Sequence, residues 1–141
     1  MPSNIRTPTD QTASASSIDG APSPDTDDAL LGVSIGGVTN IVLSVTAIYD
    51  GDSDGTGGTQ RSRVYYSFDG VSYTLVREVS GVLYTEGHTD VVSVGNGSLT
   101  NFRVQAYAAS TAGAGAPVPF ANTDILSWFV TYDTPGMVVE G

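Results

Sequence analysis

Hydrophobic and polar residues alternate along three stretches of the chain, residues 38–49, 102–108 and 125–132. A period of two is typical of a strand with one buried face. We expect a strand in each stretch, and the side chains that share its buried face are Ile41, Leu43, Val45, Ala47 and Tyr49, then Phe102, Val104, Ala106 and Ala108, then Leu126, Trp128, Val130 and Tyr132.

Two further runs, residues 61–68 and 71–79, are rich in β-branched and aromatic residues and flank Asp69-Gly70. Both central positions of a type I′ turn need positive φ, which Asp tolerates and Gly accepts freely. We therefore expect a hairpin with a two-residue turn. Shorter strands are expected at residues 82–85 and 90–94.

Seven or eight strands separated by Gly, Pro and Asn segments indicate an all-β fold, an antiparallel β-sandwich. The segment 99–117, LTNFRVQAYAASTAGAGAP, resembles the sixth strand and following loop of fibronectin type III domains, and residues 63–79 are similar to the third strand and its successor. The resemblance implies an immunoglobulin-like or fibronectin type III-like sandwich in the broad sense. The chain departs from that family because its one Trp, Trp128, lies on the last predicted strand and not on 38–49.

Residues 1–28 consist mainly of Ser, Thr, Pro, Asp and Ala, with Ile5 and Ile18 as their sizeable apolar side chains. That is too little apolar surface to order the segment by itself. We expect an extended N-terminal arm over 1–28, ordered along a partner protein through Ile5, Arg6 and Ile18, and a sandwich domain over 29–141. One helical turn is expected at residues 25–31.

The formal net charge of −10, with no lysine and five arginines, would repel a phosphate backbone, so we expect no nucleic-acid partner. There is no cysteine, so disulfides and thiolate metal sites are excluded. The first residues lack a basic and apolar leader pattern, and no apolar run has the length of a membrane span. We expect a chain that is neither exported by a standard signal nor bound to a membrane.

A Gly-x-Ser-x-Gly string occurs at residues 32–36, and His88 follows it. A nucleophile elbow needs a strand before the serine and a helix after it. Here Gly37 leads into the predicted strand at 38–49, so Ser34 is interpreted as structural and no enzymatic activity is expected.

Asp50, Asp52 and Asp54, followed by Gly55, match the opening of a calcium-binding loop. The position that an EF-hand gives to a bidentate Glu is occupied by Arg61. A solvated acidic loop between strands is the simpler interpretation, and a bound Ca²⁺ is the alternative.

Adjacent residues of a strand point to opposite faces, so one of Tyr65 and Tyr66 is expected to face outward and to contribute to a partner surface. An acidic, unexported β-sandwich with a polar arm resembles small virion proteins of tailed bacteriophages. The resemblance implies a capsid decoration (cement) protein of the virion, assembled in the host cytoplasm, that binds the major capsid protein and itself. The alternatives are a head-to-tail or tail component, or a calcium-dependent carbohydrate-binding module that recognises a host surface.

Overall fold

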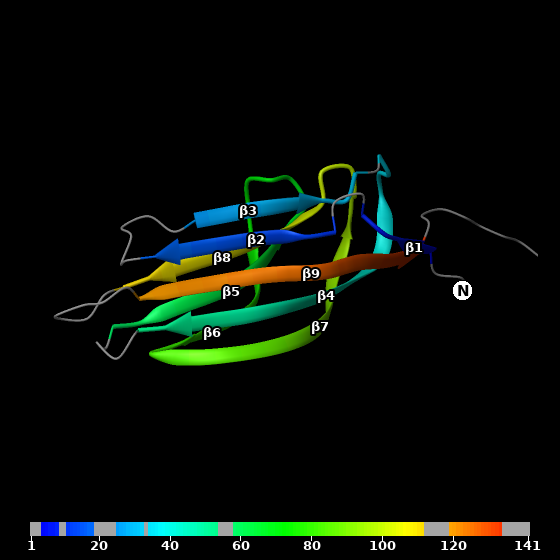
Figure 1. The fold of residues 1–141 in the computed structure, drawn as a ribbon. Coiled ribbons are helices and arrows are strands. Elements are labelled where there is room, and N and C mark those ends of the chain that lie inside the picture. Colours follow the sequence, from blue (N-terminus) through cyan, green and yellow to red (C-terminus); the bar gives the residue numbers. More distant parts are fainter. Residues whose placement is uncertain are drawn as a thin grey trace, which may run out of the picture.

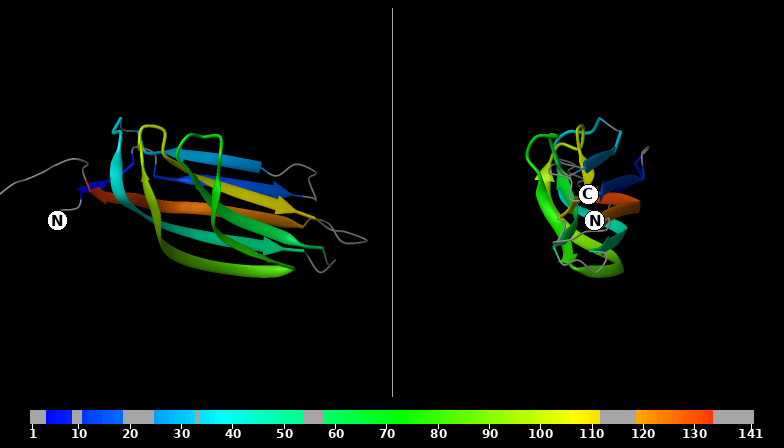
Figure 2. Two further views of the ribbon diagram at one scale, coloured as in Figure 1. Left: turned by 180° about the vertical axis from the view of Figure 1, so that it is seen from behind. Right: turned by 60° about the vertical axis from the view of Figure 1, so that its left-hand side comes forward.

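The computed structural model describes residues 4–8, 11–18, 25–32, 34–53, 58–111 and 119–133. In these residues nine strands form two antiparallel sheets that pack on each other (Figures 1 and 2). The predicted antiparallel β-sandwich is confirmed. Within the described ranges there is no helix long and apolar enough to cross a membrane.

The five-stranded sheet is built around β4 (Val38–Asp52), which pairs with β7 (Leu83–Gly97) on one side and β9 (Phe120–Asp133) on the other. The short strands β1 (Asn4–Arg6) and β2 (Ala13–Ile18) follow one another along the second edge of β9. β7 runs without interruption through the two separate strands expected from the sequence, because β4 is long enough to pair with all of it.

The four-stranded sheet has the order β3 (Asp25–Leu30), β8 (Arg103–Ser110), β5 (Gln60–Ser67) and β6 (Thr74–Gly81). In the immunoglobulin fold the last strand lies in the same sheet as the sixth. Here β9 pairs with β4 in the other sheet, and β3 occupies the place beside β8. The sandwich is therefore shared with that family, whereas this strand order is not.

The core lies between the two sheets and follows the predicted alternation of β4 and β8. The inward side chains of both strands are at most 1% exposed, and they are Ile41, Leu43, Val45, Ala47 and Tyr49 of β4 and Val104, Ala106 and Ala108 of β8. At one end, Phe102 packs between Tyr66 and Trp128, with ring centroids 6.0 Å away in each case. Trp128 is 1% exposed, so its predicted burial is confirmed.

The predicted burial is wrong for one residue of β9. Leu126 is 48% exposed, while Trp128, Val130 and Tyr132 are buried. The register against β4 shifts by one residue at this point, which makes Leu126 the extra residue of a β-bulge. Two neighbouring side chains, Leu126 and Ser127, are consequently exposed in succession.

The predicted two-residue hairpin turn is also wrong, because β5 ends at Ser67 and β6 begins at Thr74. Gly70 has φ 78°, as expected, but Asp69 does not have positive φ. The Asp69 Oδ1 atom instead accepts hydrogen bonds from the backbone N–H groups of Val71 (2.8 Å) and Ser72 (2.9 Å). An aspartate that bonds to the backbone in this way stabilises a longer turn.

The N-terminal segment is the largest departure from expectation. The helical turn predicted at residues 25–31 is wrong, because β3 is a strand that pairs with β8 along its whole length. Ala13, Ala15 and Ala29 are at most 3% exposed, so this segment contributes small side chains to the core. Described parts of 1–28 thus lie on the sheets of their own chain, and whether residues 29–141 fold without them stays a prediction.

Candidate functional site: an outer face rich in tyrosine and arginine

The outer face of the four-stranded sheet carries two adjacent cross-strand rows of large polar and aromatic side chains. We call it the tyrosine–arginine face. The rows follow directly from the strand register, and each crosses β3, β8, β5 and β6 in that order: Thr26, Tyr107, Arg63 and Glu78, then Asp28, Gln105, Tyr65 and Leu75.

Three tyrosines pack edge to face on this surface. The Tyr65 ring lies 5.8 Å from the Tyr107 ring at an interplanar angle of 81°, and 6.5 Å from the Tyr73 ring at 83°. Each such pair contributes about 0.5–1.5 kcal/mol beyond its burial. Because neighbouring rings are nearly perpendicular, they hold one another in place but do not form a flat stacking platform.

Arg63 contacts both neighbours in its own row and one residue of the second row. Its guanidinium carbon lies 4.8 Å from the Tyr107 ring centroid, its Nη1 donates to the Tyr65 hydroxyl at 3.0 Å, and its Nε forms an ion pair with Glu78. Burial disfavours the charged guanidinium, but the hydrogen bonds to Glu78 and Tyr65 outweigh it and the pKa of Arg63 is raised. Arg63 therefore stays charged and occupies one face of the Tyr107 ring.

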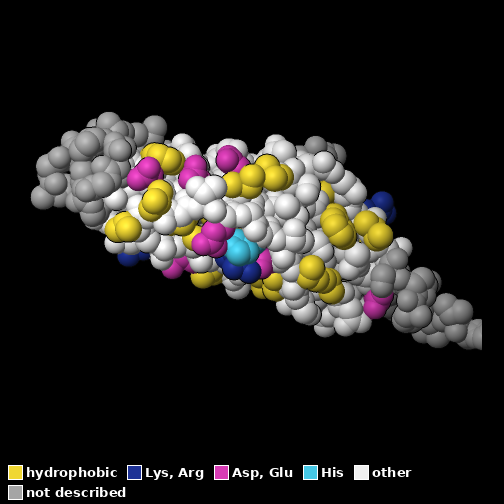
Figure 3. Space-filling model, turned by 60° about the horizontal axis from the view of Figure 1, so that its bottom comes forward, with side chains coloured by type: hydrophobic (Ala, Val, Ile, Leu, Met, Phe, Trp, Pro, Cys, Tyr) yellow, Lys and Arg dark blue, Asp and Glu magenta, His cyan; other side chains and the backbone are white. Residues whose placement is uncertain are grey.

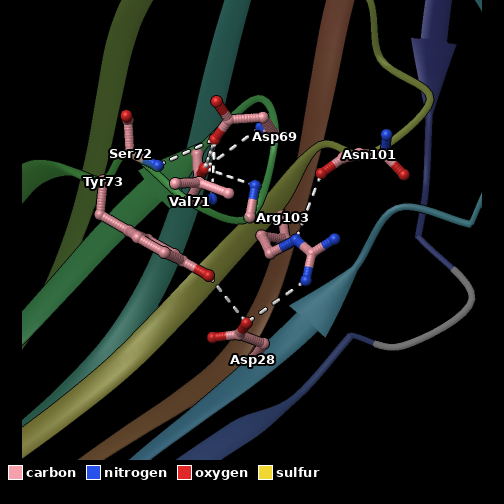
Figure 4. Close-up of polar contacts among 9 residues, drawn as sticks. Asp28, Asp69, Val71, Ser72, Tyr73, Asn101 and Arg103 are labelled. Carbon is pink, nitrogen blue, oxygen red and sulfur yellow. Dashed lines mark hydrogen bonds and ion pairs between the residues drawn. The ribbon is translucent and has the colours of Figure 1, made fainter.

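Asp28 of β3 contacts both Tyr73 and Arg103 and holds them together (Figure 4). The Tyr73 hydroxyl donates to Asp28 Oδ2 at 2.9 Å, and Arg103 Nη1 lies 3.5 Å from the same oxygen. Burial, and then the hydrogen bond to Asp28, raise the pKa of Tyr73. These contacts connect β3, the turn before β6 and the start of β8.

Gly70 allows that turn to lie directly on the arginine. A Cβ atom at Gly70 would be 2.8 Å from the Arg103 guanidinium carbon, and its φ of 78° also disfavours other residues. The turn, Arg103 and Asp28 are thus packed as one unit, which fixes the position of the Tyr73 ring.

Exposed apolar side chains lie around the tyrosines. Leu30 is 42% exposed, Leu75 48% and Val71 81%. Arg61, the next outward residue of β5, has no ion-pair partner among the described residues. Tyrosine and arginine with apolar neighbours is the composition enriched at the centres of protein interfaces.

The residues predicted as partner contacts do not come together at one place. Tyr65 lies on the tyrosine–arginine face, whereas Tyr66 points inward and stacks on Phe102. Ile5, which is 63% exposed, lies on the other sheet, and the side chain of Ile18 lies outside the described residues. Arg6 Nε donates to the Tyr132 hydroxyl of β9 at 3.1 Å.

Of the partner contacts predicted from the sequence, only Tyr65 lies on this face. A signal was present, because Arg61, Arg63 and Tyr65 are spaced two residues apart, and Arg103, Gln105 and Tyr107 have the same spacing. That spacing places each set on one face of a strand.

The three aspartates of the predicted calcium loop are only partly described. Asp50 and Asp52 belong to β4 and not to a loop, and Asp50 Oδ1 accepts a hydrogen bond from the Thr85 hydroxyl at 2.9 Å. Asp54 lies outside the described residues. Within the part that is described, no group of three or more acidic or histidine side chains is placed to hold a metal ion. Calcium binding stays a prediction.

Ser34 and His88 are far apart. Residues 34–37 lead directly into β4, and the Ile35 carbonyl accepts a hydrogen bond from Leu99 N–H at 2.7 Å, beyond the end of β7. His88 lies nine residues before that end, about 30 Å along the strand at roughly 3.3 Å per residue. Its Nε2 lies 2.7 Å from Glu86 Oε1. The two side chains form no catalytic pair.

No family model matches the chain, and no curated protein matches it. Among solved structures, a chain of infectious bursal disease virus strain Gt is similar at 12% identity and a TM-score of 0.39, over 94% of this chain. A chain of strain Gx has 10% identity and a TM-score of 0.35 over 96%, and a family two carbohydrate esterase from Cellvibrio japonicus has 9% and 0.24 over 91%. This chain spans 37%, 36% and 37% of those chains, respectively. At such TM-scores the similarities give no information on the function or the partners of this chain.

Proposed function

We propose that this chain is a non-enzymatic structural protein of a virion, and specifically a capsid decoration protein that binds major capsid proteins and stabilises the head. The observation that carries the proposal is the tyrosine–arginine face, because it is composed and ordered like a protein-binding surface. The acidic β-sandwich with its polar N-terminal segment supports the same class through its resemblance to small virion proteins of tailed bacteriophages.

The rigidity of the face favours a protein partner. The Tyr65 and Tyr73 hydroxyls are held by Arg63 and Asp28, so their rings lose little freedom when a partner covers them. A preordered surface retains more of its contact energy as affinity. The exposed side chains of Leu30, Val71 and Leu75 supply apolar area for that contact.

The arginines of the tyrosine–arginine face favour a partner with acidic groups. The chain has a net charge of −10, yet Arg61, Arg63 and Arg103, three of its five arginines, lie on this one sheet face. A partner surface with carboxylates would be attracted here and repelled by most of the remaining molecule. The partner that fits is therefore a capsid surface with acidic groups opposite Arg61.

A carbohydrate-binding module is the second candidate, because tyrosines are the side chains on which sugars stack. The perpendicular arrangement of the Tyr65, Tyr73 and Tyr107 rings, and the guanidinium over Tyr107, leave no coplanar pair of open ring faces. The geometry thus favours the protein partner. A head-to-tail or tail position would use the same face on a different virion protein.

The test is a binding assay with capsids of the parent virus from which this protein has been removed. The full chain should co-sediment with them in a fixed ratio, and Leu75→Asp and Arg61→Glu should weaken binding by about 30-fold, or roughly 2 kcal/mol for a central contact. Val82→Asp is the control, because Val82 is 54% exposed in the short link between β6 and β7 and not on this face.

The outcomes separate the candidates. Failure of the full chain to bind capsids, together with binding to tails or to glycans, would replace the decoration role by one of the alternatives. Equal binding of Leu75→Asp, Arg61→Glu and the parent to capsids would remove the tyrosine–arginine face from the proposal.

A further inference from the structure

The outer face of the five-stranded sheet differs in chemistry from the tyrosine–arginine face. Two adjacent cross-strand rows run over β7, β4 and β9, and they consist of Val91, Ser44 and Phe129, then Thr89, Thr46 and Ser127. We call this surface the serine–threonine face. The Thr46 and Thr89 hydroxyls bond to each other at 2.9 Å, so part of its polar groups are already paired.

Large apolar side chains are exposed among these hydroxyls. Val91 is 68% exposed, Leu126 48%, Phe129 39% and Ile48 37%. The β-bulge directs Leu126 outward, so this side chain does not pack in the core. Figure 3, which brings the lower edge of Figure 1 forward, shows hydrophobic side chains in separate groups, with charged side chains beside the single histidine and others elsewhere on the view.

The serine–threonine face contains no cation. β4, β7 and β9 have no arginine, and the chain has no lysine. Its outward carboxylates lie toward the two ends, Asp50, Asp52 and Asp124 at one end and Asp133 at the other, away from the row of Val91, Ser44 and Phe129. A face without charge at its centre is typical of the core of a protein interface.

We infer that the serine–threonine face binds a second copy of this chain, face to face about a two-fold axis. A two-fold interface places a patch against itself, so any charge near the axis would meet its own copy. The centre of this face avoids that penalty. Most other surfaces of the chain carry carboxylates, and two molecules of net charge −10 repel one another there.

The area of the face is close to what each partner of a standard interface buries. β4 and β7 have 15 residues each and β9 has 14. At about 3.3 Å per residue and about 4.8 Å between strands, these three strands cover roughly 700 Å². A standard interface buries about 800 Å² per partner, so contact over most of this face approaches that value.

The dimer would present two tyrosine–arginine faces that point in opposite directions, because those faces lie on the other side of each sandwich. This last consequence rests on the proposed function. Two binding faces on one rigid particle would bridge two capsid proteins with higher avidity than either face alone.

The experiment is sedimentation velocity of the full chain over a concentration series at low and high salt. We expect a species of twice the 14.5 kDa chain mass, favoured by salt because screening reduces the repulsion of two acidic molecules. Val91→Asp and Leu126→Asp should each raise the dimer dissociation constant roughly tenfold or more, since each buries a charge at the interface. Val82→Asp and Leu75→Asp should leave it unchanged.

Thermal melting of each variant identifies those that fail to fold, and the two sites provide independent probes. A monomer at every concentration and salt would overturn the inference, as would a dimer that Leu75→Asp disrupts and Val91→Asp does not. The measurement uses no capsids, so its failure would leave the proposed capsid binding standing, and failure of capsid binding would leave the dimer standing.

Discussion

Gly51 of β4 provides a sharp test of how the two sheets are joined. It pairs with Tyr84 of β7, and a Cβ atom at Gly51 would lie 2.4 Å from Tyr84 Cζ and 2.6 Å from its hydroxyl oxygen. Carbon atoms in contact are ordinarily about 3.5–4.0 Å apart. Gly51→Ala would therefore force the Tyr84 ring out of its site.

That displacement has two costs. The Tyr84 hydroxyl bonds to the Ser62 hydroxyl of β5 at 2.9 Å, and Ser62 also donates to the Asn122 carbonyl of β9 at 2.9 Å. Overpacking costs about 1–3 kcal/mol, and a buried hydroxyl without a partner costs about 1–3 kcal/mol. We expect Gly51→Ala to lower the free energy of unfolding by about 2–6 kcal/mol, a large share of the roughly 5–15 kcal/mol typical of a domain.

The assay is urea denaturation of a double-mutant cycle. Tyr84→Ala alone should cost about 3–5 kcal/mol, but in that background Gly51→Ala has no ring to displace and should cost less than about 1 kcal/mol. Gly87→Ala is the matched control, because a Cβ atom at Gly87 meets nothing within 4 Å. A Gly51→Ala protein as stable as the parent would contradict the predicted clash, and so would an equal cost of Gly51→Ala with and without the Tyr84 ring.

Trp128→Ala should cost about 3–5 kcal/mol in urea denaturation, because Trp128 is 1% exposed in the core, and a parent-like midpoint would contradict the register of β9. If Asp50, Asp52 and Asp54 bind calcium, the melting temperature should be higher in millimolar calcium than in chelator. Identical melting curves would favour the interpretation of this segment as a solvated acidic loop. Deletion of residues 1–28 should lower the melting temperature, since it removes β1, β2 and most of β3, and unchanged melting would show that 29–141 is an independent domain. The backbone N–H groups of Ser72 and Val71 lower the pKa of Asp69, so its ionised form stabilises the fold at neutral pH and that contribution is lost as pH falls through the folded pKa. The difference in melting temperature between the parent and Asp69→Asn should thus narrow below about pH 4, and a constant difference would exclude this role.

The sequence predicts the central strands well and the peripheral ones poorly. β4 and β8 bury every second side chain, and this alternation is visible locally. The strands before β4 contain mostly Ser, Thr, Asp and Ala, and they are strands because they pair with β9 and β8, up to 128 residues away in the chain as in Asn4 and Tyr132. No local pattern carries that information, since the preference of such residues depends on their tertiary partners.

The bulge at Leu126 and the tyrosine–arginine face have the same explanation. A period of two cannot show where an extra residue is inserted, because the insertion is defined against the partner strand β4. In the same way, the alternation at Arg63 and Tyr65 places both on one side of β5, but the contact with Tyr107 exists only because β5 and β8 pair in one register. The composition of a face is thus predictable from one strand, and its geometry is not.

The pairing of β1 with β9 also determines how the molecule responds to force. Asn4 lies opposite Tyr132 in an antiparallel ladder. The start of β1 and the end of β9 are therefore at the same end of the sheet. Tension applied through residues 4 and 132 would open this ladder one hydrogen bond at a time, like a zipper, and would not load all of its bonds together. In an optical trap, handles at these positions should therefore detach β1 at low force, whereas handles that pull β4 and β7 along their length in opposite directions should meet a much higher one.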